Sequence, residues 1–139
     1  MQASGLIDTG AILALLDQDD QWHESCTQAF SELRLPLATS AAVLAKLFHL
    51  LNEGRRELEA AWGFLHSGAV TVLPIADADL ASLHDLMTKY HDRPMDFADA
   101  TLVHLAERES LSTVLTVDFD DFETYRVGGR RRFRVFPSR

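Results

Sequence analysis

Two hydrophobic periodicities alternate along the chain. Short, nearly continuous apolar runs predict buried strands, and apolar residues spaced three or four apart predict helices. The predicted strands cover residues 5–8, 35–40, 69–76, 111–118 and 132–137. The predicted helices cover residues 9–18, 20–34, 40–51, 56–66, 77–91 and 95–110, with a helical turn at 120–125. This alternation is typical of an α/β domain, in which helices cover both faces of a parallel sheet.

The helix predicted at residues 40–51 contains one polar residue at an unexpected place. Its apolar stripe includes Val43, Leu47 and Leu51, and either Thr39 or Ser40 can cap its start. Lys46 falls at the edge of this stripe. A lysine there can bury its aliphatic stem and extend its ammonium group into water.

Four aspartates fall where the predicted sheet would place a ligand site. In parallel α/β sheets that site lies beyond the carboxyl ends of the strands. Asp8 ends the first strand and Asp118 ends the fourth, while Asp96 and Asp99 open the helix between the third and fourth strands. We therefore expect three segments to deliver carboxylates to one edge of the sheet. Each aspartate also has an ordinary structural interpretation, as a helix cap, a first-turn acid or a turn residue.

Converging carboxylates would repel one another, and a hard divalent cation relieves that repulsion. Mg²⁺ typically takes one or two carboxylates and retains several waters. Such a site suits metal-assisted phosphoryl transfer. Thr116, two residues before Asp118, is either a hydrogen-bond partner of a carboxylate or phosphate, or an ordinary strand threonine.

Composition narrows the class of protein. The 139 residues, 47% hydrophobic and 24% charged, predict a single soluble domain over residues 1–139. The single cysteine, Cys26, allows no intramolecular disulfide. No apolar run is long enough to span a membrane, and the first residues lack a signal-peptide pattern. We expect a cytoplasmic protein without a membrane partner.

The net charge of −8 conceals an uneven distribution. Six of the thirteen lysines and arginines lie in the last fourteen positions: Arg126, Arg130, Arg131, Arg132, Arg134 and Arg139. A basic strip of this kind can contact phosphates. It can equally be a solvated strand edge or a surface for an acidic protein.

Other chemistries lack support in the sequence. The six histidines form no HxxxH pair and no zinc-type cluster with Cys26. Neither a GxGxxG nor a GxxxxGK[ST] loop occurs, so we expect no nucleotide cofactor. No serine or cysteine has the setting of a catalytic nucleophile.

Four segments together resemble a known family: "LIDTGAILALLD", "TSAAVLAKLFHLL", "PMDFADATLVHLAE" and "VLTVDFDDF". In order and spacing they are similar to the signature segments of PIN-domain ribonucleases, most of all the VapC-type toxins of prokaryotic toxin–antitoxin pairs. The resemblance implies a three-layer α/β/α sandwich around a parallel five-stranded sheet. It also implies RNA cleavage by an activated water at a Mg²⁺ or Mn²⁺ site.

The resemblance assigns roles to individual residues. Asp8, Asp99 and Asp118 match the family's catalytic and metal-binding acids, and Asp96 and Asp121 are secondary acids. We expect phosphate or substrate contacts from a further set of residues: Thr9, Thr116, Arg130, Arg131 and Arg132. A cognate antitoxin and a homodimer are the implied partners, and the helix faces around Trp22 and residues 58–66 are apolar enough to meet one.

Lys46 departs from the family pattern. It stands where the segment T-x-x-x-V-L-x-E would place a glutamate ligand. Its ammonium group is expected to pair with Asp8 or Asp99 and to compete with a cation there. The three remaining carboxylates still suffice for one Mg²⁺. The sequence thus predicts either an impaired but active ribonuclease or an inactive PIN-like module that retains antitoxin and RNA contacts.

Overall fold

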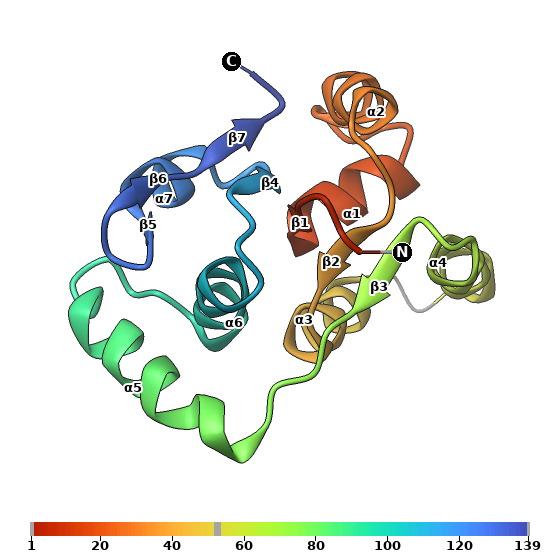
Figure 1. The fold of residues 1–139 in the computed structure, drawn as a ribbon. Helices are drawn as coiled ribbons and strands as arrows, with labels where there is room; N and C mark the ends of the chain where they lie inside the picture. The colour runs from red at the N-terminus through yellow and green to blue at the C-terminus, as the bar shows by residue number, and fades with distance from the viewer. Residues whose placement is uncertain (1, 52–53, 139) are drawn as a thin grey trace.

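A parallel five-stranded sheet forms the centre of the computed structural model, which describes residues 2–51 and 54–138 (Figure 1). The strands are β1 (Leu6–Ile7), β2 (Leu37–Thr39), β3 (Val70–Val72), β4 (Thr113–Leu115) and β7 (Arg134–Phe136). They lie in the order β3-β2-β1-β4-β7, and every neighbouring pair is parallel. The predicted α/β fold with a central parallel five-stranded sheet is confirmed.

Helices cover both faces of this sheet. They are α1 (Thr9–Leu16), α2 (His23–Glu32), α3 (Ala41–Leu50), α4 (Arg55–His66), α5 (Leu80–Lys89), α6 (Phe97–Arg108) and α7 (Phe119–Thr124). A short 3₁₀ turn, η1 (Asp77–Asp79), precedes α5. Helices α1, α2 and α4 lie on one side of the strands, and α5 and α6 lie on the other (Figure 1). This arrangement gives the three layers that the resemblance implies.

Helix caps explain why two of these helices begin where they do. Ser40, one of the two predicted caps of α3, accepts a hydrogen bond from the Val43 amide at 3.2 Å. Asp96 caps α6 and accepts from the Asp99 amide at 2.8 Å. Each cap satisfies an amide that the first helical turn leaves without a partner. Both helices therefore start at the edge of the sheet that holds the aspartates.

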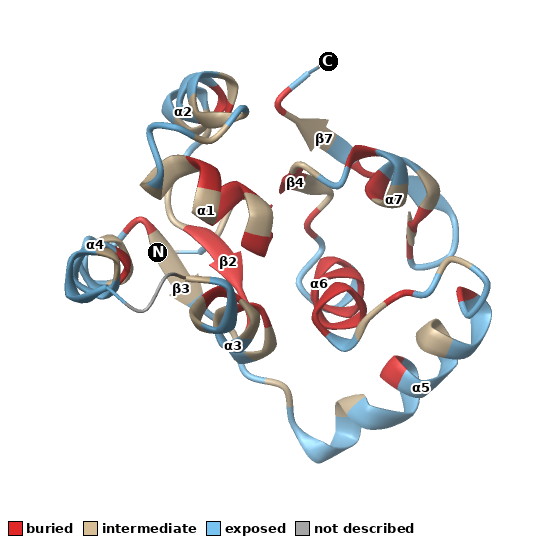
Figure 2. Cartoon of the chain, turned by 180° about the vertical axis from the view of Figure 1, so that it is seen from behind, coloured by how far each residue is buried: buried red, intermediate tan, exposed pale blue. Residues whose placement is uncertain are grey.

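Helix α6 is the most deeply buried element. Every residue from 98 to 106 is buried, so that the helix appears almost entirely red in Figure 2. It lies in contact with α3, α5 and the short strand β5 (Arg126–Val127). Leu6 and Ile7 of β1 and Val114 and Leu115 of β4 are fully buried in the same core. The amino end of α6 is consequently held in a fixed position against the sheet.

The third strand differs from its prediction. The run at residues 69–76 indicates a buried strand, but Val72 is 47% exposed and Val70 and Thr71 are only partly covered. β3 is an edge strand that pairs with β2 alone. A continuous apolar run cannot by itself distinguish an edge strand from a central one.

The sequence pattern also missed a small antiparallel hairpin. Strands β5 and β6 (Arg131–Arg132) pair across a turn in which Gly128 and Gly129 have φ angles of +61° and +76°. Two successive residues with positive φ are the requirement of a type I′ hairpin turn, which glycine meets without strain. The basic tail thus forms the hairpin and β7, and Arg139 lies outside the described residues. Within residues 2–51 and 54–138, no helix has the length and apolar character needed to cross a membrane.

Candidate metal centre

Asp8 leaves the end of β1 and enters the buried edge of the sheet. Its Oδ1 accepts a hydrogen bond from the Thr9 amide at 2.8 Å, and its Oδ2 accepts one from the Thr116 hydroxyl at 3.1 Å. The side chain is only 2% exposed. Burial raises the pKa of Asp8 from 3.8 to about 6; the Thr9 amide opposes the shift and the negative charge of Asp118 adds to it. A buried carboxylate of this kind favours a bound proton or a bound cation.

Asp99 reaches the same point from the first turn of α6. Its Oδ2 accepts a hydrogen bond from the buried Tyr125 hydroxyl at 3.1 Å. Its Oδ1 is buried and has no hydrogen-bond partner among the described residues. Burial, followed by the charges of Asp8 and Asp96, raises the pKa of Asp99 to about 7. An unpartnered carboxylate oxygen is costly to bury, and a proton, a water or a cation bound there would relieve that cost.

Asp118 lies at the start of α7, on the open side of the site. Its amide donates to the Thr116 hydroxyl at 3.0 Å, and its own carboxylate is exposed. Burial and the charge of Asp121 raise the pKa of Asp118. A Cβ at Gly10 would lie 2.6 Å from Val117 Cγ2, so glycine at that position lets α1 approach the loop before Asp118. A cavity of about 310 Å³, lined by residues 117–121, opens beside it.

These three carboxylates converge. Asp8, Asp99 and Asp118 each offer one oxygen, and the three oxygens lie within 4.8 Å of one another. Carboxylate oxygens are the ligands that Mg²⁺ and Mn²⁺ prefer. Together with the unpartnered Asp99 Oδ1, this donor set fits a divalent cation. Three distant segments, predicted from the sequence to meet at one sheet edge, do meet there.

The secondary acids have other partners. Asp96 uses Oδ1 to cap α6 and Oδ2 to bind the Lys46 ammonium group at 2.7 Å. Asp121 pairs with Arg93 at 3.0 Å. Neither belongs to the cluster of converging carboxylates found among the described residues. The helix-cap interpretation of Asp96 is therefore correct.

Lys46 does not pair with Asp8 or Asp99 as expected. Its direct partner is Asp96, which lies at the mouth of the site with 44% of its side chain exposed. Burial alone would lower the pKa of Lys46, but the hydrogen bond and charge of Asp96, with the charges of Asp8 and Asp99, raise it. The ammonium group in turn partly opposes the rise in the pKa of Asp8, Asp99 and Asp118.

The two threonines predicted to contact phosphate or substrate both have protein partners. The Thr9 hydroxyl donates to the Val43 carbonyl at 3.2 Å, and the Thr116 hydroxyl donates to Asp8. Both residues are buried, and each hydroxyl has a single proton to donate. They hold α3 and Asp8 in place, and their contacts with phosphate or substrate stay predictions. Of the two sequence interpretations of Thr116, carboxylate binding is the one observed.

Two positioning contacts escaped the sequence analysis. Ser40, predicted only as a cap, also hydrogen-bonds Thr101 of α6 at 2.7 Å and so joins α3 to α6. Tyr125 orients Asp99 across 26 residues of sequence. No local pattern in the chain marks either contact, because both depend on how the elements pack.

We expect Tyr125→Phe to weaken divalent-cation binding at neutral pH. Loss of the hydroxyl removes a donor that favours ionised Asp99, so the pKa of Asp99 rises further above about 7. A rise of one pKa unit would weaken Mn²⁺ binding roughly fivefold at pH 7 and little at pH 8.5. Calorimetric Mn²⁺ titration across this range measures the change. Tyr90→Phe is the matched control, because its hydroxyl accepts from the Arg126 amide instead. Equal binding by Tyr125→Phe and the parent at pH 7 would contradict this role.

Comparison with known proteins adds independent evidence. A family model described as the PIN domain matches residues 5–127. Ribonuclease VapC26 of Mycobacterium tuberculosis is 31% identical over 135 residues, which cover 95% of this chain and 99% of that protein.

Two solved structures share the fold. The crystal structure of M. tuberculosis VapC20, a toxin described as cleaving the sarcin-ricin loop, matches with a TM-score of 0.74 and 23% identity, covering 85% of this chain and 94% of that one. Rickettsia felis VapBC2, bound to a DNA fragment from its promoter, matches with a TM-score of 0.67 and 13% identity, covering 94% and 96%.

Proposed function

The chain belongs to the PIN-domain family, and from this premise we propose that it is a metal-dependent endoribonuclease, the toxin of a toxin–antitoxin pair. The observation that carries the proposal is the convergence of Asp8, Asp99 and Asp118, whose carboxylate oxygens lie within 4.8 Å of one another. The relative that is 31% identical is named a ribonuclease. A cytoplasmic location follows from the proposal, because RNA substrates are found there.

Each residue of the centre has a distinct part in this proposal. A bound Mg²⁺ or Mn²⁺ would supply an activated water and neutralise charge on the scissile phosphate. Asp8 and Asp99 would hold the cation, with Thr116 and Tyr125 fixing the orientation of their carboxylates. Asp118, on the open side, would complete the ligand set where RNA approaches. The buried side of the site would exclude bulk water around the two inner carboxylates.

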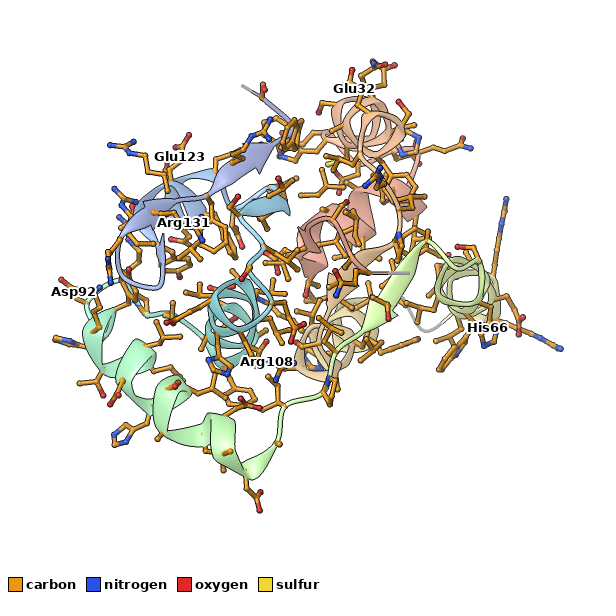
Figure 3. All side chains as sticks on the ribbon, viewed as in Figure 1. Glu32, His66, Asp92, Arg108, Glu123 and Arg131 are labelled. Carbon is orange, nitrogen blue, oxygen red and sulfur yellow. The ribbon has the colours of Figure 1, made fainter. Side chains whose placement is uncertain are left out.

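The basic hairpin supports a path for RNA. Arg130, Arg131 and Arg132 are exposed, and Arg131 lies on β6 on the same side of the molecule as Glu123 of α7 (Figure 3). A cavity of about 300 Å³ is lined by Arg132 and Phe119, and Phe119 also lines the cavity beside Asp118. Cations along this route can bind the phosphates that flank the cleaved bond.

An apolar surface on α3 and α4 supports the proposed protein partners. Leu50, Leu58 and Trp62 are 51%, 38% and 48% exposed, and the Trp62 ring lies 5.2 Å from that of Phe48. Exposed apolar side chains that gather in one place are typical of an interface. We assign this surface to an antitoxin or to a second copy in a homodimer. Trp22 is a weaker candidate, since it packs edge-on against Phe119 at 5.0 Å.

A second candidate function rests on Lys46. Its ion pair with Asp96 places a positive charge beside the carboxylates, where it opposes cation binding. If the charge of Lys46 prevents a divalent cation from binding, the chain is a PIN-like module that binds antitoxin and RNA without cleaving RNA. The two candidates differ in turnover and not in RNA binding.

We expect the purified chain to cleave RNA in Mg²⁺ or Mn²⁺ and to lose activity in EDTA. Removal of the cation leaves the carboxylates without the charge that binds and polarises the phosphate. Gel analysis of a 5′-labelled RNA, with cation added back after EDTA, measures this dependence. RNA binding without cleavage in either cation would favour the inactive module. Cleavage that persists in EDTA would overturn the metal-dependent mechanism.

A further inference from the structure

Lys46 contributes a positive charge to the carboxylate centre from a fixed position on α3. We propose that Lys46 is a built-in counter-cation, which keeps Asp96 out of the ligand set and limits the centre to one divalent cation. The inference rests on the proposed metal centre but concerns how many cations it holds. It is carried by the 2.7 Å contact between the Lys46 ammonium group and Asp96 Oδ2.

The position of Lys46 is set by helix packing. The Ser40 hydroxyl, which caps α3, hydrogen-bonds Thr101 of α6 at 2.7 Å. The Thr9 hydroxyl of α1 donates to the Val43 carbonyl of α3 at 3.2 Å. These buried contacts join α3 to the two helices that begin beside Asp8 and Asp99. Lys46 is therefore presented to the centre by a supported helix, and 37% of its side chain is exposed.

Both carboxylate oxygens of Asp96 are in use. Oδ1 accepts from the Asp99 amide at 2.8 Å, and Oδ2 accepts from Lys46. A divalent cation at Oδ2 would lie next to an ammonium group and be repelled by it. Asp96 can ligate a cation only after the ion pair breaks. Asp121 is also paired, since its Oδ1 accepts from Arg93 at 3.0 Å.

The charges of the centre then favour a single divalent cation. Two acid–base pairs, Lys46–Asp96 and Arg93–Asp121, border the converging carboxylates and are each neutral overall. When ionised, Asp8, Asp99 and Asp118 carry three negative charges. One divalent cation leaves one net negative charge among them, whereas two would leave one net positive charge beside Lys46 and Arg93. Like charges so close together are unfavourable.

Mn²⁺ counting tests the proposal without any need for RNA cleavage. The full chain, freed of metal, is titrated with Mn²⁺ at pH 8, and free Mn²⁺ is measured by electron paramagnetic resonance alongside calorimetry. We expect one tightly bound Mn²⁺ in the parent protein. Lys46→Met removes the charge and releases Asp96, so a second Mn²⁺ should bind and the first should bind roughly tenfold tighter. Lys46→Glu adds a ligand and should also bind two.

Matched variants separate the charge of Lys46 from other effects. Lys46→Arg keeps the positive charge and should bind one Mn²⁺ ion, as the parent does. Lys89→Met alters the other lysine of the chain, whose ammonium group lies over the Tyr90 ring, and should change nothing. Asp96→Asn retains the cap but leaves Lys46 unpaired, so the single Mn²⁺ should bind more weakly. Circular dichroism verifies that each variant is folded.

Two Mn²⁺ ions in the parent, or a Lys46→Met count and affinity equal to the parent's, would overturn the proposal. The same data distinguish it from the ribonuclease assignment. Suppose that the parent binds one Mn²⁺ and that Lys46→Met changes the binding as expected, but that RNA is never cleaved. The ribonuclease assignment is then refuted, and the proposed role of Lys46 as a counter-cation stands. If RNA cleavage depends on Mn²⁺ but Lys46→Met binds the same number of Mn²⁺ ions with the parental affinity, only the counter-cation role of Lys46 is refuted.

Discussion

Asp99→Asn is expected to abolish RNA cleavage while making the metal-free protein more stable. The change removes one of three converging carboxylates, so kcat/KM should fall at least roughly 100-fold. Burial has raised the pKa of Asp99 to about 7, which means that the ionised group destabilises the folded state at higher pH. At pH 8 in EDTA the variant should gain about 4 kcal/mol. Chemical denaturation and a cleavage assay measure the two opposite effects.

The isosteric amide makes this substitution a clean test. Asparagine can still accept the Tyr125 hydrogen bond at the oxygen that replaces Asp99 Oδ2, so the packing of α6 is retained. Asp85→Asn, in the exposed part of α5 and outside the carboxylate cluster, is the matched control. Its activity and stability should equal those of the parent. Asp99→Asn protein that cleaves RNA at the parental rate would refute the role of Asp99 in the centre.

The metal-free protein is expected to lose stability as the pH rises from 5 to 8. Asp8 and Asp99 titrate at about 6 and about 7 when folded, but at 3.8 when unfolded. Between about pH 4 and pH 7 the folded state thus binds more protons than the unfolded state, and each rise in pH favours unfolding. From pH 5 to pH 8 the loss should be about 4 kcal/mol, or roughly 15 °C in Tm. Thermal unfolding in EDTA across this range measures it.

Mn²⁺ should weaken this pH trend. Protons compete with a cation for the same oxygens, so the cation binds the folded state more tightly as the pH rises. At a Mn²⁺ concentration about 100 times the Kd, binding adds about 2.7 kcal/mol and offsets most of the loss. The double variant Asp8→Asn/Asp99→Asn lacks both titrating groups and should have a flatter profile in EDTA. If parent and double variant gave superimposable pH profiles, the two aspartates would not be the source of the effect.

Much of the fold follows from local patterns. The strand and helix runs, the Ser40 and Asp96 caps and the aspartates after β1 and at the start of α6 all depend on residues close in sequence. Parallel pairing then brings the carboxyl ends of β1 and β4 to one edge, since their residues align as Leu6 with Val114 and Ile7 with Leu115. The convergence of Asp8 and Asp118 is therefore predictable once the sheet is assumed. Their roles in binding metal and cleaving RNA stay predictions.

The partner of each polar group was less predictable. Charge alone allowed Lys46 to pair with any nearby aspartate, and only the placement of α3 against α6 selects Asp96. The contacts of Tyr125 with Asp99 and of Arg93 with Asp121 could not be predicted, because the paired residues are far apart in sequence. β3 has the apolar run of a central strand, yet its place at the sheet edge leaves Val72 exposed. In each case the competing arrangements have similar local sequence preferences.

By itself, the sequence determined the order of the five sheet strands and of the main helices, the family resemblance and the three aspartates on which the proposed chemistry depends. The hydrophobic period, the helix caps and the acids at strand ends depend only on residues close in sequence. They can therefore be recognised before the tertiary structure is known. Only the tertiary structure decided which carboxylates remain available. It buried Asp8 and Asp99 beside Asp118 and gave Asp96 and Asp121 cationic partners. The physical reason is that ion pairing and desolvation depend on distances between segments remote in sequence, which the packing of α3, α6 and α7 sets.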